Sequence, residues 1–160
     1  MKLDPYWVTG FVDGEGTFYV GINSQPSMKT GFQVLPEFRI VQHERDIQLL
    51  YALKEFFNAG VVRVNHGDRY ELRIRNLSVL KETVIPFFEK YPLHTKKSID
   101  FIKFRKIILK MINQEHLTKE GIVRIIEIAS QMNRADKPKA QEIKKDLQMD
   151  KDNVHACEKS

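Results

Sequence analysis

The chain has 160 residues, 42% of them hydrophobic and 29% charged, a size that suits one globular domain and leaves little room for a second. Its formal charge of +5 favours a polyanionic partner. The only cysteine, Cys157, excludes an intrachain disulfide, and no run approaches the ~18 apolar residues of a membrane span; we expect an intracellular protein without a membrane partner.

The first predicted element is a short helix that begins at Pro5. Asp4 is a good N-cap, proline fits the first helical position, and glycines at 14 and 16 favour a stop. Asp13 and Glu15 therefore lie at the carboxyl end, where unpaired carbonyls already carry partial negative charge. An acidic side chain there costs a few tenths to ~1 kcal/mol unless a cation is close, and a divalent cation is the obvious candidate.

One face of this helix carries two small residues, Gly10 and Gly14, four positions apart. That spacing lets the backbone of another helix approach closely. We expect a second helix to pack against this face.

Alternating residues then predict two strand pairs separated by a helix. The first pair has Phe18, Val20 and Ile22 inward, a loop over 24–31, and a second strand ending near Gln42. Pro36 falls on the inward side of that strand, which should be bent or at a sheet edge there. A helix over 46–57 follows, and then strands near 62–65 and 70–75 with Val62 and Val64 inward.

The rest of the chain reads as helical. A segment over 77–85 is interrupted by Pro86 and stops at position 92, a longer helix spans 98–112 with Ile99 and Ile102 in its apolar face, and Thr118 caps a helix that runs to 132. We assign residues 1–132 to one α+β domain. Residues 133–160 form a basic polar tail whose pattern allows a last helix over 140–149.

The outward strand positions carry side chains that suit nucleic-acid bases. Arginine, asparagine and glutamine make bidentate contacts to guanine and adenine edges, and a two-stranded ribbon fits the major groove. Glu37 and Glu71 dilute this positive face and could accept from cytosine or pair with neighbouring arginines. The alternative is a merely solvated sheet. The candidate DNA-binding residues are Tyr19, Asn23, Gln25, Gln33, Glu37, Arg39, Arg63, Asn65, Arg69, Glu71, Arg73 and Arg75, with Lys137 and Lys139 of the tail as phosphate contacts.

Residues 8–16, Val-Thr-Gly-Phe-Val-Asp-Gly-Glu-Gly, resemble the LAGLIDADG motif of homing endonucleases. Gly10, Asp13 and Gly16 are identical to the motif letters, and the other six positions are conservative or small replacements. The resemblance implies an αββαββα domain with a four-stranded antiparallel saddle sheet that contacts DNA, here with extra C-terminal helices. Only one copy of the motif is present.

The resemblance also implies roles for individual residues. Glu15 would bind divalent metal with the backbone carbonyl of Gly14, whereas Asp13 would satisfy amides of a partner helix at the dimer interface that Gly10 helps to form. Gln42 would orient the attacking water. Lys96, in a Pro-Leu-x-x-Lys-Lys segment, would stabilise phosphate charge, with Lys97 as a further phosphate contact. Oxygen ligands suit Mg²⁺, with Ca²⁺ or Mn²⁺ able to substitute.

The activity that the resemblance implies is that of a single-motif homing endonuclease. A homodimer would hydrolyse both strands of a long, roughly palindromic double-stranded DNA target in a metal-dependent reaction and leave 3′ overhangs. Its location would be a chloroplast, a mitochondrion or a prokaryotic cytoplasm. Two alternatives stay open: a maturase that binds intron RNA, alone or as a dual function, and a noncatalytic DNA-binding regulator on the same fold.

Overall fold

The computed structural model describes residues 1–132 and 145–146. Most of the predicted tail, including Lys137, Lys139 and nearly all of the predicted helix over 140–149, lies outside the described residues. Among the helices that the structure describes, none combines the length and the apolar character that crossing a membrane requires.

The element order confirms the predicted α+β class. Helix α1 (Pro5–Glu15) leads into β1 (Gly16–Ser24) and β2 (Phe32–His43); a 3₁₀ turn and α2 (Ile47–Phe57) precede β3 (Val61–His66) and β4 (Arg69–Ile74). The chain continues through α3 (Leu77–Val79), a π-helical turn (Leu80–Val84), α4 (Ile85–Lys90), α5 (Lys97–Ile112), a 3₁₀ turn and α6 (Lys119–Ala129). From α1 to the helices that follow β4, this order contains the predicted αββαββα unit.

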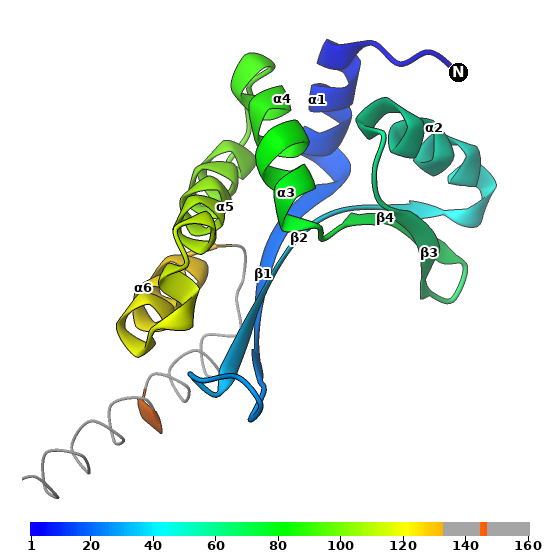
Figure 1. Ribbon diagram of the computed structural model, residues 1–160. Helices are drawn as coiled ribbons and strands as arrows, with labels where there is room; N and C mark the ends of the chain where they lie inside the picture. Colours follow the sequence, from blue (N-terminus) through cyan, green and yellow to red (C-terminus); the bar gives the residue numbers. More distant parts are fainter. Residues whose placement is uncertain (133–144, 147–160) are drawn as a thin grey trace, which may run out of the picture.

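The four strands form one antiparallel sheet in the order β1-β2-β4-β3. Figure 1 shows a curved sheet with the helices on one side of it and its other side open. β2 pairs with β1 from Phe32 to Ile40 and with β4 only from Phe38 onward. Pro36, which lacks an N–H, therefore lies where β2 has a single neighbour, and the predicted edge position is confirmed.

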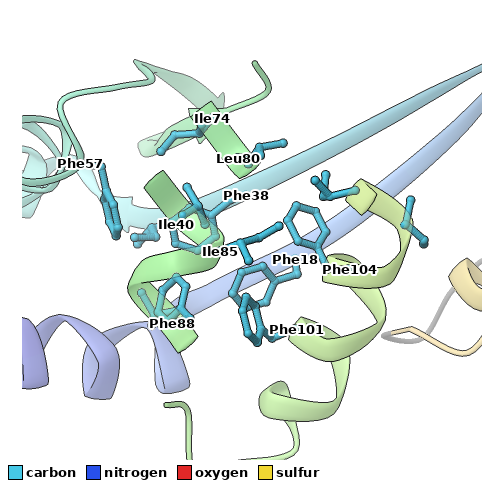
Figure 2. Close-up of a cluster of buried hydrophobic side chains, with 14 of the residues drawn as sticks. Phe18, Phe38, Ile40, Phe57, Ile74, Leu80, Ile85, Phe88, Phe101 and Phe104 are labelled. Atoms are coloured by element: carbon cyan, nitrogen blue, oxygen red, sulfur yellow. The ribbon is translucent and has the colours of Figure 1, made fainter. Parts of the chain in front are cut away.

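Aromatic side chains hold the helices to the sheet. Phe18 of β1 and Phe38 of β2 stack with ring centroids 5.2 Å apart, and Phe88, Phe101 and Phe104 close around them at 5.3 to 5.6 Å (Figure 2). Such ring pairs contribute about 0.5–1.5 kcal/mol each beyond the burial of their apolar area. The side of the sheet that packs on the helices is thereby fixed, and the alternate strand positions face outward.

Two predicted core positions of α5 are wrong. Ile99 and Ile102 are 50% and 51% exposed, because the buried face of the helix is instead the one that reaches the sheet aromatics. That face contains Phe101, Phe104, Ile107, Ile108 and Met111. A helix rich in apolar residues on several sides does not reveal from its own pattern which side meets the core.

Val64 of β3 also departs from the prediction, since half of it is exposed. β3 is an edge strand of the sheet, and its pairing with β4 is irregular between Val64 and His66.

The helical segment is not interrupted at Pro86 as predicted. The π-helical turn just before Pro86 widens the backbone, where the proline ring would otherwise clash with a carbonyl one turn earlier.

α6 supports the far end of the β1–β2 hairpin. The N-cap hydroxyl of Thr118 accepts from the Gly121 amide at 3.0 Å, as predicted for a helix start. Ile122 and Ile126 then form a small cluster with Ile22 of β1 and the residue that begins β2, separate from the main core. In Figure 1 α6 lies beside the part of the hairpin that extends past β3 and β4.

Candidate active site

The carboxyl end of α1 is the junction of the helix with the sheet. Asp4 accepts from the amides of Tyr6 and Trp7 at 2.9 and 3.1 Å, so the predicted N-cap is confirmed, and the helix ends at Glu15. A Cβ on Gly16 would lie 2.6 Å from Val12 Cγ1, which explains why β1 begins with glycine. Glu15 is exposed at this junction, where its carboxylate meets the negative end of the helix dipole.

Asp13 is engaged within its own chain. Its carboxylate accepts from the His94 and Thr95 amides at 2.9 and 3.1 Å and from Thr95 Oγ1 at 2.7 Å. Burial alone would raise the pKa of Asp13, but these hydrogen bonds outweigh it and hold that pKa below its ordinary value. Both oxygens of Asp13 thus anchor the loop before α5 to α1 within the chain, and the contact of Asp13 with amides of a partner helix stays a prediction.

The same loop leads into α5, whose first residue, Lys97, contacts the end of α1. Its Nζ donates to the Val12 carbonyl at 3.0 Å, and the side chain is half-buried between elements. Desolvation by burial lowers the pKa of Lys97, while the charges of Asp13 and Glu15 partly oppose the shift. Lys96, to which the sequence assigned the active-site role, is exposed. The contact with α1 belongs to the second lysine of the pair.

The sheet register brings Gln42 to the same place. Gly16 pairs with Ile40 of β2, so Gln42, two residues further along β2, lies just beyond the start of β1 and next to the end of α1. By strand alternation it shares the face of Ile40, which is turned toward the helices. Three separate segments of the chain therefore approach the carboxyl end of α1: the helix end with Glu15, the start of α5 with Lys97, and the end of β2 with Gln42.

The glycine face of α1 is open in a single chain. A Cβ on Gly10 or Gly14 would meet no atom within 4 Å. On the same exposed part of the helix, Tyr6 and Trp7 are 72% and 46% exposed, and Trp7 stacks on Phe11 with ring centroids 5.0 Å apart. Tyr6 and Trp7 were not predicted to lie on the face that carries Gly10. Their position one turn before Gly10 on the same helix could have indicated that they share it.

The open face of the sheet carries the predicted base-reading side chains. Asn23 lies opposite Gln33 near the tip of the β1–β2 hairpin, and Arg39 lies opposite Arg73 at the centre. The guanidinium of Arg39 sits 5.1 Å from the ring centroid of Tyr19. Gln25 follows β1 in the connecting loop, where its backbone N–H donates to the Gly31 carbonyl at 2.8 Å.

Glu37 and Glu71 are buried beneath arginines on this face. Glu37 is 3.1 Å from Arg39 Nε and 2.7 Å from Arg75 Nε. Glu71 is 3.5 Å from Arg63 Nε and 4.0 Å from Arg73 Nη1. We call these residues the arginine–glutamate cluster: Glu37, Arg39, Arg63, Glu71, Arg73 and Arg75. Of the two roles that the sequence left open for the glutamates, the structure shows the pairing with arginine.

Arg69 begins β4, beside a contact between His43 and Asp68 that the sequence did not predict. His43 is opposite Arg69 in the register, and its Nε2 is 2.9 Å from an oxygen of Asp68 in the β3–β4 turn. His43 Nδ1 also accepts from the Arg45 amide at 3.2 Å. The contact between His43 and Asp68 joins the end of β2 to the β3–β4 turn. The two residues are brought together by the strand register.

The part of the chain that the structure describes contains no cluster of three or more histidine, cysteine, aspartate or glutamate side chains suited to a metal ion. One chain offers the Glu15 carboxylate and the Gly14 carbonyl at the end of α1, both of them hard oxygen donors. A complete coordination shell at this point needs oxygen atoms from outside the chain.

Known proteins resemble both the sequence and the structure. A family model described as LAGLIDADG endonuclease matches residues 8–108. A Neurospora crassa protein named probable intron-encoded endonuclease 2 is 36% identical over 133 residues, which cover 82% of this chain and 29% of that protein. The crystal structure of the homing endonuclease I-TnaI has 60% identity and a TM-score of 0.88, covering 92% of this chain and 99% of that one.

A further solved structure contains DNA. The LAGLIDADG homing endonuclease I-SmaMI bound to cleaved DNA has 33% identity and a TM-score of 0.86, covering 88% of this chain and 47% of that one. Another structure of I-SmaMI holds its uncleaved DNA target in the presence of calcium ions. This chain therefore spans 29% of the Neurospora crassa relative and 47% of I-SmaMI, but 99% of I-TnaI. With the motif at the end of α1 and the αββαββα order in place, the chain belongs to the LAGLIDADG homing endonuclease family.

Proposed function

We propose that this protein is a site-specific endonuclease that cuts both strands of double-stranded DNA as a homodimer. The observation that carries the proposal is the hydrogen bond of Lys97 to the end of α1 that carries Glu15, beside a helix face that a single chain leaves open; the strand register, which brings Gln42 near the start of β1, supports it. The likeness to I-SmaMI, which was solved with cleaved DNA, supports the substrate class. The relative named as intron-encoded supports an origin in intron DNA. We further propose an organelle as the location.

The donor atoms at this site fit a hard divalent cation. Glu15 and the Gly14 carbonyl would hold Mg²⁺, for which carboxylate and carbonyl oxygens are suitable ligands, with phosphate oxygens of the DNA completing the shell. When bound, Mg²⁺ would neutralise the phosphate and lower the pKa of a bound water. The structure of I-SmaMI with its uncleaved DNA target, solved in the presence of calcium ions, supports a divalent cation.

The remaining side chains of the site would carry the other parts of phosphodiester hydrolysis. Gln42 would hold the attacking water through its amide, in line with the scissile bond. Lys97 would place its ammonium against the negative charge that develops on the phosphate, and its anchorage to the Val12 carbonyl restricts where that charge can sit. Asp13 would act indirectly, by fixing the loop that carries Lys97.

Two copies of this site are needed to break two strands, and one chain supplies one. Packing of the Gly10 and Gly14 faces against each other would bring two α1 ends together around a twofold axis. The two sheets would then follow the major groove on either side, so the target would be long and roughly palindromic. Cuts across the intervening minor groove would leave 3′ overhangs.

The test is cleavage of a plasmid that carries a duplex selected from a random library by the wild-type protein. With Mg²⁺, we expect wild type to linearise the plasmid and Glu15→Gln to bind it without cutting. Glu82→Gln is the matched control, because Glu82 is an exposed residue of the π-helical turn and its substitution makes the same change in charge. Sequencing of the ends would check the overhangs.

Three results would contradict the proposal. Selective DNA binding without cleavage by wild type would instead fit a DNA-binding regulator. Equal cleavage by wild type and Glu15→Gln would remove the carboxylate from the chemistry. Failure to bind duplex DNA, together with selective binding of structured RNA, would fit the maturase alternative.

A further inference from the structure

We propose that Glu37 and Glu71 are specificity-determining positioning residues: each buried carboxylate holds arginines in the orientation that reads base edges, and neither carboxylate reads a base itself. The inference rests on the proposed DNA-binding function of the sheet. It assigns the two glutamates a role different from that of the exposed side chains around them.

Burial is the first argument. The sheet face that holds both glutamates is not covered by helices (Figure 1), yet the side chains of Glu37 and Glu71 are only 5% and 4% exposed. Their own neighbours must therefore cover them, and those neighbours are the arginines of the cluster. A cytosine amino group could not reach either carboxylate without displacing a guanidinium group.

The atoms that make the contacts give the second argument. Arg75 donates through Nε to Glu37 at 2.7 Å, and Arg39 Nε lies 3.1 Å from the other oxygen of Glu37 as an ion pair without a hydrogen bond. Arg63 Nε lies 3.5 Å from Glu71 and donates to the Val64 carbonyl at 3.4 Å, whereas Arg73 faces Glu71 with Nη1 at 4.0 Å. A guanidinium that meets a carboxylate through Nε leaves open the end-on edge that its two terminal nitrogens form. Those terminal nitrogens form the fork that donates to O6 and N7 of guanine. The carboxylate thus fixes the base of the fork and leaves its reading end available.

Asn65 is oriented in the same way. Its Nδ2 donates to Glu71 Oε2 at 2.8 Å. An ionised carboxylate only accepts hydrogen bonds, so the amino side of the amide must face Glu71. The carbonyl of Asn65 is then the part that is presented to a partner.

The register supplies the third argument. Arg39 and Arg73 lie directly opposite each other on β2 and β4, an arrangement of like charges that is normally unfavourable. Glu37 precedes Arg39 by two residues on its strand, and Glu71 precedes Arg73 by two, so a carboxylate flanks this pair on either side. Burial and the charges of Arg75 and Arg63 lower the pKa of Arg73, whereas the two glutamates oppose the shift. The carboxylates make a close array of arginines compatible with a folded sheet.

The consequence for recognition is a lower affinity for DNA of any sequence and a stronger preference for the correct sequence. Unpaired arginines would reach phosphates, which adds binding strength that is independent of sequence. Arginines held by Glu37 and Glu71 are restrained from that contact and are aligned with base edges. Removal of one carboxylate should therefore increase binding to any duplex and decrease the preference for the correct one.

The experiment compares Glu37→Gln and Glu71→Gln with wild type and with the control Glu82→Gln. Each protein selects from a duplex library with a random central tract in Ca²⁺, and each is titrated with calf thymus DNA over a range of salt. We expect both glutamate variants to bind calf thymus DNA more tightly, with a salt slope steeper by about one for each released arginine. The ratio of specific to nonspecific affinity should fall about tenfold, with information lost at several adjacent positions.

The outcomes separate this inference from the proposed function. A wild type that selects no sequence would overturn the proposed function. A wild type that selects sharply, with glutamate variants that select equally sharply, would overturn only the positioning role. Loss of information at a single C·G pair would also overturn it, because that pattern marks a glutamate that reads cytosine.

Because the substitutions remove a buried negative charge from among several arginines, the variants could fail to fold. The wild-type protein then provides the test. In its crystal structure with the selected duplex, we expect both carboxylates to remain beside the arginine guanidinium groups of the cluster. A carboxylate oxygen within hydrogen-bonding distance of a base would overturn the inference.

Discussion

Lys96 and Lys97 are adjacent and carry the same charge, but only the second meets α1. A cation is useful to phosphoryl chemistry when its position is fixed before the charge develops, and the hydrogen bond from Lys97 to the Val12 carbonyl provides that restraint. Lys96 is exposed and has a much larger range of orientations. Exposure and anchorage, rather than charge, distinguish the two residues.

Substitution of each lysine by methionine tests this distinction. We expect Lys97→Met to lower the single-turnover cleavage rate in Mg²⁺ about 10²- to 10³-fold, as for the loss of one donor to a developing anion, with DNA affinity in Ca²⁺ nearly unchanged. Lys96→Met should cleave at a rate close to that of wild type. The reverse ranking would return the role to Lys96.

The hydrogen bonds of Asp13 predict how the free energy of unfolding depends on this residue and on pH. Asp13→Asn would leave at least one donor of the 94–95 loop without an acceptor, so we expect it to cost about 1 kcal/mol at neutral pH. Because the folded-state pKa of Asp13 is lowered, its contribution is fully present above the ordinary aspartate pKa of about 3.9 and is lost as pH falls through the lower folded value.

The measurement is urea unfolding of wild type and Asp13→Asn over a series of pH values. The difference in unfolding free energy should shrink as the solution becomes strongly acidic. A difference that stays constant through the acid range would show that ionised Asp13 is not its source.

At the scale of elements, local patterns predicted most of the fold. Alternation placed all four strands, and Asp4 and Thr118 marked two helix starts, because these signals depend only on neighbouring residues. The choice between Lys96 and Lys97 was not accessible, since it depends on a loop that Asp13 anchors from 81 residues away. The pairing of Glu37 with Arg75 likewise spans 38 residues and follows from strand order alone.

The role of α6 is an element-level prediction. Ile122 and Ile126 pack on the far end of the β1–β2 hairpin, whereas Ile125 of the same helix belongs to the main core. We expect Ile122→Ala with Ile126→Ala to increase amide hydrogen exchange in the hairpin around Ile22, since each truncation removes about 2–5 kcal/mol of packing. Strand β4 should keep its protection.

Ile125→Ala is the matched control for this experiment. Its cavity lies in the core that all elements share, so exchange should rise across the sheet as well as in the hairpin. If the double variant also raised exchange evenly over the sheet, α6 would be a general part of the core and not a support for the hairpin.

At the scale of the whole molecule, we propose that the open face of α1 determines the assembly. A single chain has room for a side chain at Gly10, so a larger residue there should not disturb the monomer. A helix interior even gains about 1 kcal/mol when glycine is replaced by a better helix former. If two α1 helices pack closely at this face, the same side chain would hold their backbones apart.

The series Gly10→Ala and Gly10→Leu therefore gives opposite results for folding and for assembly. We expect both variants to melt as monomers at or above the temperature at which the wild-type subunit melts, while sedimentation shows graded loss of the dimer, nearly complete for leucine. Double-strand cleavage should decline in the same order, because each monomer retains its own Glu15 but lacks the second site. A Gly10→Leu protein that sediments as a dimer and linearises plasmid would place the subunit contact on another surface.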